Sequence, residues 1–223
     1  PVLRAMFERI LGESPYQSPT DMGVNMAGNC IFDDEAVSDA SRREIVRRYY
    51  QAMCDLRTGR GEESAVAKIE LLMNKAEITV DINPTVAASL RKAEETGMPA
   101  VAIELPDGQV ITGKTSSLLG ASSAALLNAL KVLAGLDDSL HLIAPEVIEP
   151  IQHLKISHLG NHNPRLHTDE TLIALSISAV TDPNAERAME HLAELSGCDA
   201  HSTVILSQVD TDVFRKLGVN MSC

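Results

Sequence analysis

The sequence predicts an α/β protein in which a mainly helical subdomain, residues 1–82, precedes a mixed-sheet α/β/α subdomain, residues 83–223. Two observations lead to this prediction. Before the boundary, apolar residues recur at the spacing of amphipathic helices. From Pro99 onward, short apolar runs that are typical of strands alternate with helical patterns, and this order favours a sheet with helices on both faces.

Stop and capping signals define the elements of the first subdomain. Residues 13–32 are so rich in Gly, Pro, Ser and Asn that they predict a polar loop between helices. Asp33 or Asp34 is placed to cap the long helix that follows. The expected helices are Val2 to Leu11, Asp34 to about Leu56, and a helix through Val66 and Met73.

The second subdomain opens with Asn83-Pro84, a capping residue followed by the proline that suits a first helical turn. Pro106-Asp107-Gly108 predicts a hairpin turn, and Ser122-Ser123 predicts a helix cap. After a first helix that ends at Gly97, the expected strands are 100–105, 109–112, 140–144, 202–206 and 219–221. The expected helices are 122–133, 146–154, 169–180, 183–195 and 210–217.

Composition excludes several classes of function. The net charge of -12, the 3% aromatic content and the absence of tryptophan argue against a nucleic-acid partner, which needs a basic surface and stacking platforms. No apolar run approaches the ~20 residues of a membrane span and no secretory signal is visible, so we expect a cytoplasmic protein without a membrane partner. The basic cluster Arg42-Arg43 and Arg47-Arg48 favours an ion-paired helix surface, because acidic residues share its helix.

The segment from Lys155 to Glu170 holds three of the seven histidines beside Gly160 and Pro164, as a binding loop would. An ordinary polar surface turn is the alternative. The candidate catalytic residues are His158, His162, His167, Asp169 and Glu170, and the candidate ligand-binding residues are Lys155, Asn161, Asn163 and Arg165. A second candidate site in the polar loop comprises Ser18, Thr20, Asp21 and Asn25, with a structural Ω-loop as its alternative.

Two more specific interpretations of the polar residues, a metal site and a catalytic triad, have less support. His158 and His162 have metal-ligand spacing, but the His-Glu-x-x-His pattern of zinc proteases is absent, so no metal is expected; if one binds, its ligands are His158, His162 and His167. His201-Ser202-Thr203 can be a nucleophile beside a base, with Asp169 or Glu170 as orienter, or simply the start of a strand.

The strand pair followed by alternating helices and strands is similar to the topology of zinc-dependent nucleoside deaminases. Those enzymes place His or Cys ligands and a Glu at the starts of two helices. The corresponding helix starts in this chain are Ser122-Ser123-Ala124-Ala125 and Pro145-Glu146-Val147, which supply no ligand set. A deaminase-like topology without the zinc site is therefore expected.

Four long motifs resemble an uncharacterised bacterial family whose members are sometimes labelled ATP-dependent zinc proteases: residues 18–30, 42–50, 158–167 and 201–209. The resemblance spans the chain and implies a domain of unknown function. Because members of that family are longer, with a phosphate loop in the N-terminal half, this chain is expected to be a C-terminal part, and no cofactor is expected from it alone. ATP would bind through the absent part. Gly108 to Thr115 matches Gly-x-x-x-x-Gly-Lys-Thr, but its middle residues predict a strand rather than a phosphate loop.

Three functional hypotheses follow. The first is a C-terminal region that binds or acts on a small polar or anionic metabolite through residues 155–170. The second is a non-catalytic assembly or regulatory module of a nucleotide-binding protein, with Val2 to Leu11 and Tyr49-Tyr50 as surfaces. The third is a metal-dependent hydrolase. The expected partners are the N-terminal part of the same protein and further copies in a homo-oligomer.

Overall fold

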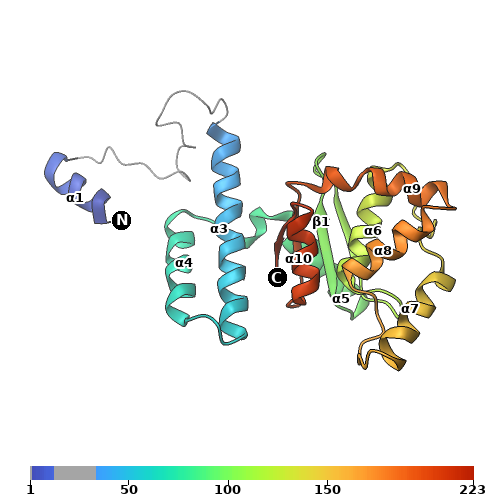
Figure 1. Ribbon diagram of the computed structural model, residues 1–223. Coiled ribbons are helices and arrows are strands. Elements are labelled where there is room, and N and C mark those ends of the chain that lie inside the picture. Colours follow the sequence, from blue (N-terminus) through green and yellow to red (C-terminus); the bar gives the residue numbers. More distant parts are fainter. Residues whose placement is uncertain (1, 13–33) are drawn as a thin grey trace. The chain divides into compact units, whose positions relative to one another are not determined.

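The computed structural model describes residues 2–12 and 34–223 (Figure 1). The polar loop predicted at residues 13–32 lies outside this part of the chain, and so do the candidates Ser18, Thr20, Asp21 and Asn25. The chain divides into two compact units, residues 1–82 and 83–223.

The first unit is helical. Its described elements are α1 (Val2–Leu11), α3 (Asp34–Arg57), α4 (Glu63–Lys75) and the short 3-10 helix η1 (Val80–Ile82). Helices α3 and α4 pack against each other, and a small core of Ile45, Val46, Met73 and Ile78 lies in this unit. Tyr49 and Tyr50 pack on this core. The three predicted helices are therefore confirmed, and both tyrosines are partly buried against the core of their own unit.

The second unit is built on a mixed sheet of strand order β2-β1-β3-β4. Strand β1 (Ala100–Glu104) is antiparallel to both β2 (Val110–Lys114) and β3 (Asp199–Ser202), whereas β3 is parallel to β4 (Asn220–Ser222). The helices are α5 (Pro84–Thr96), α6 (Ala121–Leu133), α7 (Pro145–Ser157), α8 (Thr168–Ser178), α9 (Pro183–Glu190), η2 (Leu192–Leu195) and α10 (Gln208–Lys216). The predicted α/β class with a mixed sheet is confirmed.

Alternation along β1 separates the two faces of the sheet. Val101 and Ile103 belong to the main core, together with residues of α6, α8 and α9, and Figure 1 shows these helices on one side of the strands. The small side chains of Ala100 and Ala102 form the opposite face, against which α5 packs.

Gly113 explains why the Gly-x-x-x-x-Gly-Lys-Thr pattern occurs in a strand. It lies opposite Val101, on the α6 face, and a Cβ atom added to it would stand 2.1 Å from the backbone nitrogen of Ala125. Only glycine lets α6 approach β2 so closely. The residues around it form β2 rather than a loop that could cradle phosphate.

The strand predicted at residues 140–144 is wrong. Leu142 and Ile143 are buried in the main core, but among residues 2–12 and 34–223 no strand pairs with this segment, which leads directly into α7. The apolar run fills space between helices without joining the sheet, and periodicity alone does not separate these two cases.

Other predicted boundaries shift. The strand expected at residues 202–206 is β3, which ends at Ser202. Ser122 and Ser123 are buried inside α6, whose N-cap is Gly120. The helix expected to reach Leu195 ends at Glu190 and is followed by η2.

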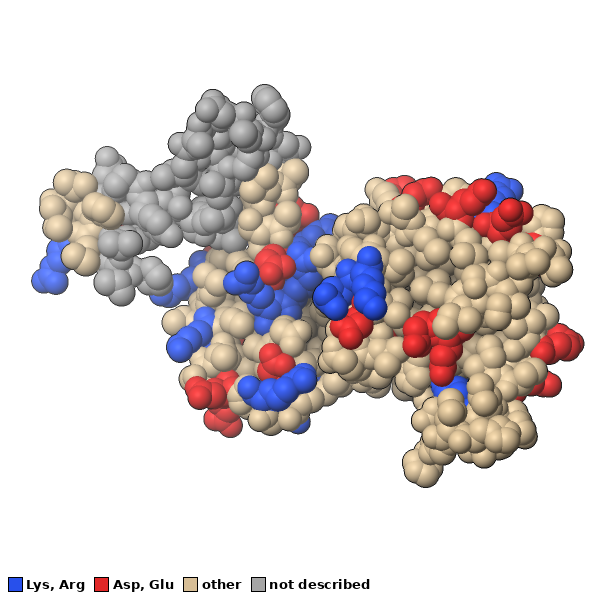
Figure 2. Space-filling view, in the orientation of Figure 1, with Lys and Arg blue, Asp and Glu red and all other residues tan. Residues whose placement is uncertain are grey.

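Three of the four arginines in the cluster on α3 are paired with acidic residues of the same helix. Basic side chains gather around α3 in Figure 2, where Arg43 pairs with Asp39 and both Arg47 and Arg48 pair with Glu44, each at 2.9 Å. These pairs match the ion-paired surface expected for the arginine cluster. No helix in the described part of the chain is both long and apolar enough to cross a membrane.

Candidate functional site

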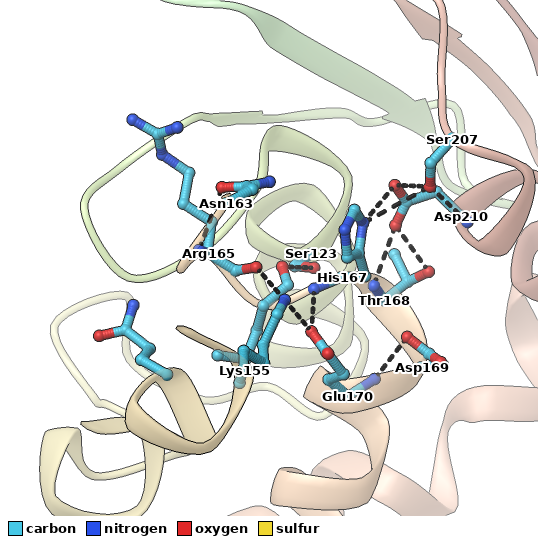
Figure 3. A network of polar contacts seen from close by, with 12 residues as sticks. Ser123, Lys155, Asn163, Arg165, His167, Thr168, Asp169, Glu170, Ser207 and Asp210 are labelled. Carbon is cyan, nitrogen blue, oxygen red and sulfur yellow. Dashed lines mark hydrogen bonds and ion pairs between the residues drawn. The ribbon is translucent and has the colours of Figure 1, made fainter. Parts of the chain in front are cut away.

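The candidate segment 155–170 connects the last turn of α7 to the first turn of α8 (Figure 3). Its end is fixed to the segment before α6 and to the first turn of that helix. Leu166 is 1% exposed, its backbone nitrogen donates to the carbonyl of Leu118, and its own carbonyl accepts hydrogen bonds from Gly120 N and Ser123 Oγ. A loop held by its backbone on one side can hold its side chains in fixed positions on the other.

The side chain of Lys155 lies beneath the backbone of this loop in Figure 3. Its side chain is 2% exposed, and Nζ donates to the carbonyl of Arg165 and to Oε2 of Glu170, both at 2.6 Å. The same Oε2 accepts the backbone N–H of His167 at 2.8 Å. Lys155 and Glu170 therefore position the backbone from Arg165 to His167.

His167 contacts a carboxylate that is distant in sequence. Its Nδ1 lies 3.1 Å from Oδ2 of Asp210 in the first turn of α10. The same carboxylate accepts hydrogen bonds from the backbone N–H and the hydroxyl of Thr168, each at 3.0 Å, and from Ser207 Oγ at 2.7 Å. The side chain of His167 remains 31% exposed, whereas that of Asp210 is 11% exposed.

The environment of Asp210 keeps it ionised. Burial alone would raise the pKa of its carboxyl group, but the hydrogen bonds from Thr168, Ser207 and His167 outweigh burial and hold that pKa below its usual range. An ionised carboxylate accepts a hydrogen bond from Nδ1–H of the imidazole, so Nε2 of His167 is left as a proton acceptor.

Asn163 and Arg165 project away from Lys155 and Glu170 in Figure 3. Arg165 is anchored through Nε, which donates to the carbonyl of Ser116 at 2.7 Å. Asn163 Oδ1 accepts the backbone N–H of Arg165 at 3.2 Å. Within the described part of the chain no hydrogen bond or ion pair engages the terminal nitrogens of the guanidinium, so they can donate to a ligand.

The remaining candidates are not drawn into this network. His158, Asn161 and His162 are exposed, and the ring of His158 stacks edge-on against His153 with 5.6 Å between centroids. Asp169 Oδ1 accepts the N–H of Glu170. Among the described residues no three His, Cys, Asp or Glu side chains lie where they could share a metal ion, so His158, His162 and His167 are not brought together.

The His201-Ser202-Thr203 arrangement does not form a triad. His201 is 3% exposed, its Nδ1 lies 2.8 Å from Ser222 Oγ, and burial lowers its pKa to about 4. Ser202 Oγ donates to the carbonyl of Val204. Glu170 is engaged by Lys155, so these groups serve the sheet, as expected for residues of a strand.

Sequence reasoning missed Thr168, Ser207 and Asp210. The spacing of Ser207 and Asp210 is a capping pattern, and Ser207 Oγ does accept the N–H of Asp210. This signal would have placed the start of α10 correctly. It would not have revealed the contact between Asp210 and His167, which are 43 residues apart.

Comparison with known proteins agrees with the resemblance of the motifs. Residues 81–223 match the C-terminal part, and residues 1–77 the N-terminal part, of a domain of unknown function, DUF1846. The chain belongs to the DUF1846 family. The predicted uncharacterised family is thus confirmed. We expected only a C-terminal part of a family member, but residues 1–77 match the N-terminal domain of the family.

Relatives in this family include UPF0371 proteins of Streptococcus thermophilus, 57% identical over 222 residues, and of Streptococcus pyogenes serotype M5, 55% identical over 222 residues. Each match covers 100% of this chain and 45% of the relative. The chain therefore spans less than half the length of these relatives.

Proposed function

We propose that segment 155–170 binds a small polar or anionic metabolite and that His167 transfers a proton on it, within a longer cytoplasmic DUF1846 protein. The contact of His167 Nδ1 with Asp210 Oδ2 at 3.1 Å, beside a partly exposed imidazole, carries this proposal. A carboxylate that orients an imidazole is a common arrangement for a general base. Lys155 and Glu170 support it by holding the adjacent backbone.

The anionic preference rests on Arg165 and Asn163. The guanidinium is fixed at one nitrogen by Ser116 and can donate from its other nitrogens, as recognition of carboxylate or phosphate requires. The amide of Asn163 adds a neutral donor from the same loop.

The test uses inorganic phosphate and malonate as probes, with binding followed by NMR of the histidine imidazoles. Arg165→Gln should weaken binding about tenfold or more, because a charge-assisted hydrogen bond is lost. His167→Asn should weaken binding and leave the melting temperature nearly unchanged, since Asn is a good N-cap for α8.

His191→Asn is the matched control. His191 also contacts a carboxylate, Glu194 Oε1 at 2.6 Å, but it lies after α9 and outside the segment. Binding that survives both site variants, or that responds equally to the control, would contradict the proposal. A large fall in melting temperature without a specific change in binding would make the loop structural.

The alternative of an assembly or regulatory module also has a supporting observation. Ile173 and Ile177 lie one turn apart on α8, and Val180 follows just after the end of this helix; they are 58%, 56% and 82% exposed. The mass of the chain in solution separates the two proposals: an oligomer that buries this stripe together with segment 155–170 favours assembly, and a monomer favours the ligand site.

A further inference from the structure

A groove runs along the free edge of the sheet in the second unit. Its volume is about 480 Å³, and all five residues of β2 line it. Lys92 from α5, and Asn128 and Val132 from α6, complete the lining together with Asp138. Because α5 and α6 cover opposite faces of the sheet, a hollow that touches both must pass around the β2 edge. That edge therefore lies recessed between the two helices.

Hydrogen bonds at the two ends of the hairpin fix the direction of the β2 backbone groups. Leu105 N donates to the carbonyl of Gln109 at 2.8 Å, and Thr115 N donates to the carbonyl of Pro99 at 2.9 Å. Both pairs continue the antiparallel register of β1 and β2. Since such a ladder alternates, the backbone groups of the even-numbered β2 residues point away from β1 and into the groove.

Thr112 is the central residue of this edge. Its carbonyl accepts Asn128 Nδ2 at 3.0 Å from the α6 side, as an outward orientation requires. In the described part of the chain no strand pairs with the outward N–H groups of Val110, Thr112 and Lys114, since β2 ends the sheet order. A row of such groups is a template for an added strand.

The two walls of the groove differ in chemistry. Lys114 lies opposite Ala100 and so belongs to the α5 face, where Lys92 also lies. No ion pair of the described residues engages either lysine, whereas Asp138 is held by Lys131 at 3.1 Å. The α6 wall offers Val132, which is 38% exposed. A strand lying in the groove would meet positive charge on one side and an apolar surface on the other.

We propose that the β2 edge docks an extended peptide segment of another protein, in which acidic residues alternate with β-branched ones. Alternation would turn the acidic side chains toward Lys92 and Lys114 and the apolar ones toward Val132. A second copy of this chain does not fit as well, because its β2 edge is equally recessed. Two recessed edges cannot approach to the spacing of about 4.8 Å that strand pairing needs.

The experiment titrates the purified chain with capped, fluorescent hexapeptides. The probe alternates Glu and Val, a first control alternates Lys and Val, and a second groups the three Glu before the three Val. We expect the alternating acidic peptide to bind best, with an affinity that falls as salt rises. Its binding should slow hydrogen exchange at the amides of Thr112 and Lys114.

Two variants test the two parts of the argument. Thr112→Pro removes one outward donor and no bond to β1, so an edge strand should tolerate it while peptide binding is lost. Reversal of both charges by Lys92→Glu and Lys114→Glu should weaken the acidic peptide about tenfold and favour the lysine peptide. Absence of binding by the acidic peptide, equal binding of all three peptides, or insensitivity to the double reversal would overturn the proposal and leave the lysines as protection of a free edge.

Discussion

Lys155 and Lys131 show how the surroundings of an ammonium group determine what it contributes. Lys155 is 2% exposed and its partner Glu170 is 25% exposed, so their interaction is largely removed from water. The side chain of Lys131 is 10% exposed, but its partner Asp138 is 98% exposed. Without Lys155, a half-buried carboxylate and the carbonyl of Arg165 would lose their donor; without Lys131, water can replace the lost contact.

We predict that Lys155→Met lowers the free energy of unfolding by about 2–4 kcal/mol, because it leaves a partly buried charge unpaired. Lys131→Met should cost about 1 kcal/mol or less. Urea unfolding of both variants at pH 7, followed by circular dichroism, measures the difference. Equal losses would mean that the Lys155 pair contributes no more than a surface pair.

His201 gives the fold a pH dependence of its own. Burial lowers its pKa from 6.5 to about 4, while the unfolded histidine keeps the ordinary value. Between these values the unfolded chain binds a proton that the folded chain does not. Falling pH therefore favours unfolding. The contribution of neutral His201 to the free energy of unfolding is fully present above pH 6.5 and is lost progressively as the pH falls toward 4.

The size of this loss follows from the separation of the two pKa values, at about 1.4 kcal/mol for each pH unit, which gives about 3 kcal/mol. His201→Asn keeps a polar group near Ser222 and cannot be protonated in this range. We predict that the unfolding free energy of the variant changes less than that of the native chain between pH 6.5 and 4. Parallel curves of stability against pH would show that His201 is not buried in its neutral form.

At the level of elements, the packing of α6 on β2 depends on one glycine. Gly113→Ala places a Cβ atom 2.1 Å from Ala125 N and 2.5 Å from Ala125 Cα, and both neighbours are backbone that cannot rotate away. We predict a loss of about 3 kcal/mol or more, measured by thermal or urea unfolding. Gly108→Ala is the control: its φ of +84° is strained for alanine, but no atom lies within 4 Å, so about 1 kcal/mol is expected. A smaller loss at Gly113 than at Gly108 would contradict close packing of α6 on β2.

The elements that the sequence predicts well are those with local end signals. Asn83 caps α5 through the N–H of Thr85, Pro84 occupies its first turn, and Gly97 ends it in a left-handed conformation. Such signals act within a few residues of the helix end and can therefore be recognised in the sequence alone. Leu142 and Ile143 carry no such signal, and only the helices around them decide that they fill the core rather than form a strand.

At the scale of the whole molecule, the same distinction applies to the candidate site. The concentration of polar residues between Lys155 and Glu170 is visible in the sequence, and so is the presence of His167. The role of each of these residues is not visible in the sequence, because it depends on the contact that α10 brings about between Asp210 and His167 and on the burial of Lys155. Long-range contacts of this kind follow from tertiary packing rather than from local pattern.

The two units have separate cores among the described residues. The main core includes only residues from Val101 onward, whereas the smaller core comprises Ile45, Val46, Met73 and Ile78. Hydrophobic burial stabilises each unit in proportion to its own core, so the first unit should be the less stable one. The chain offers a natural probe of this difference, since Tyr16, Tyr49 and Tyr50 all precede residue 83 and tryptophan is absent.

We therefore predict that urea unfolds the chain in two steps. Tyrosine fluorescence should report only the first step, while circular dichroism should show both, because each unit contains helices. A shortened chain of residues 83–223 should retain the second step at the same urea concentration and lose the first. A single transition that both probes follow together would contradict independent cores. It would mean that the two units stabilise each other, and that loss of the small helical core would also unfold the loop that carries His167.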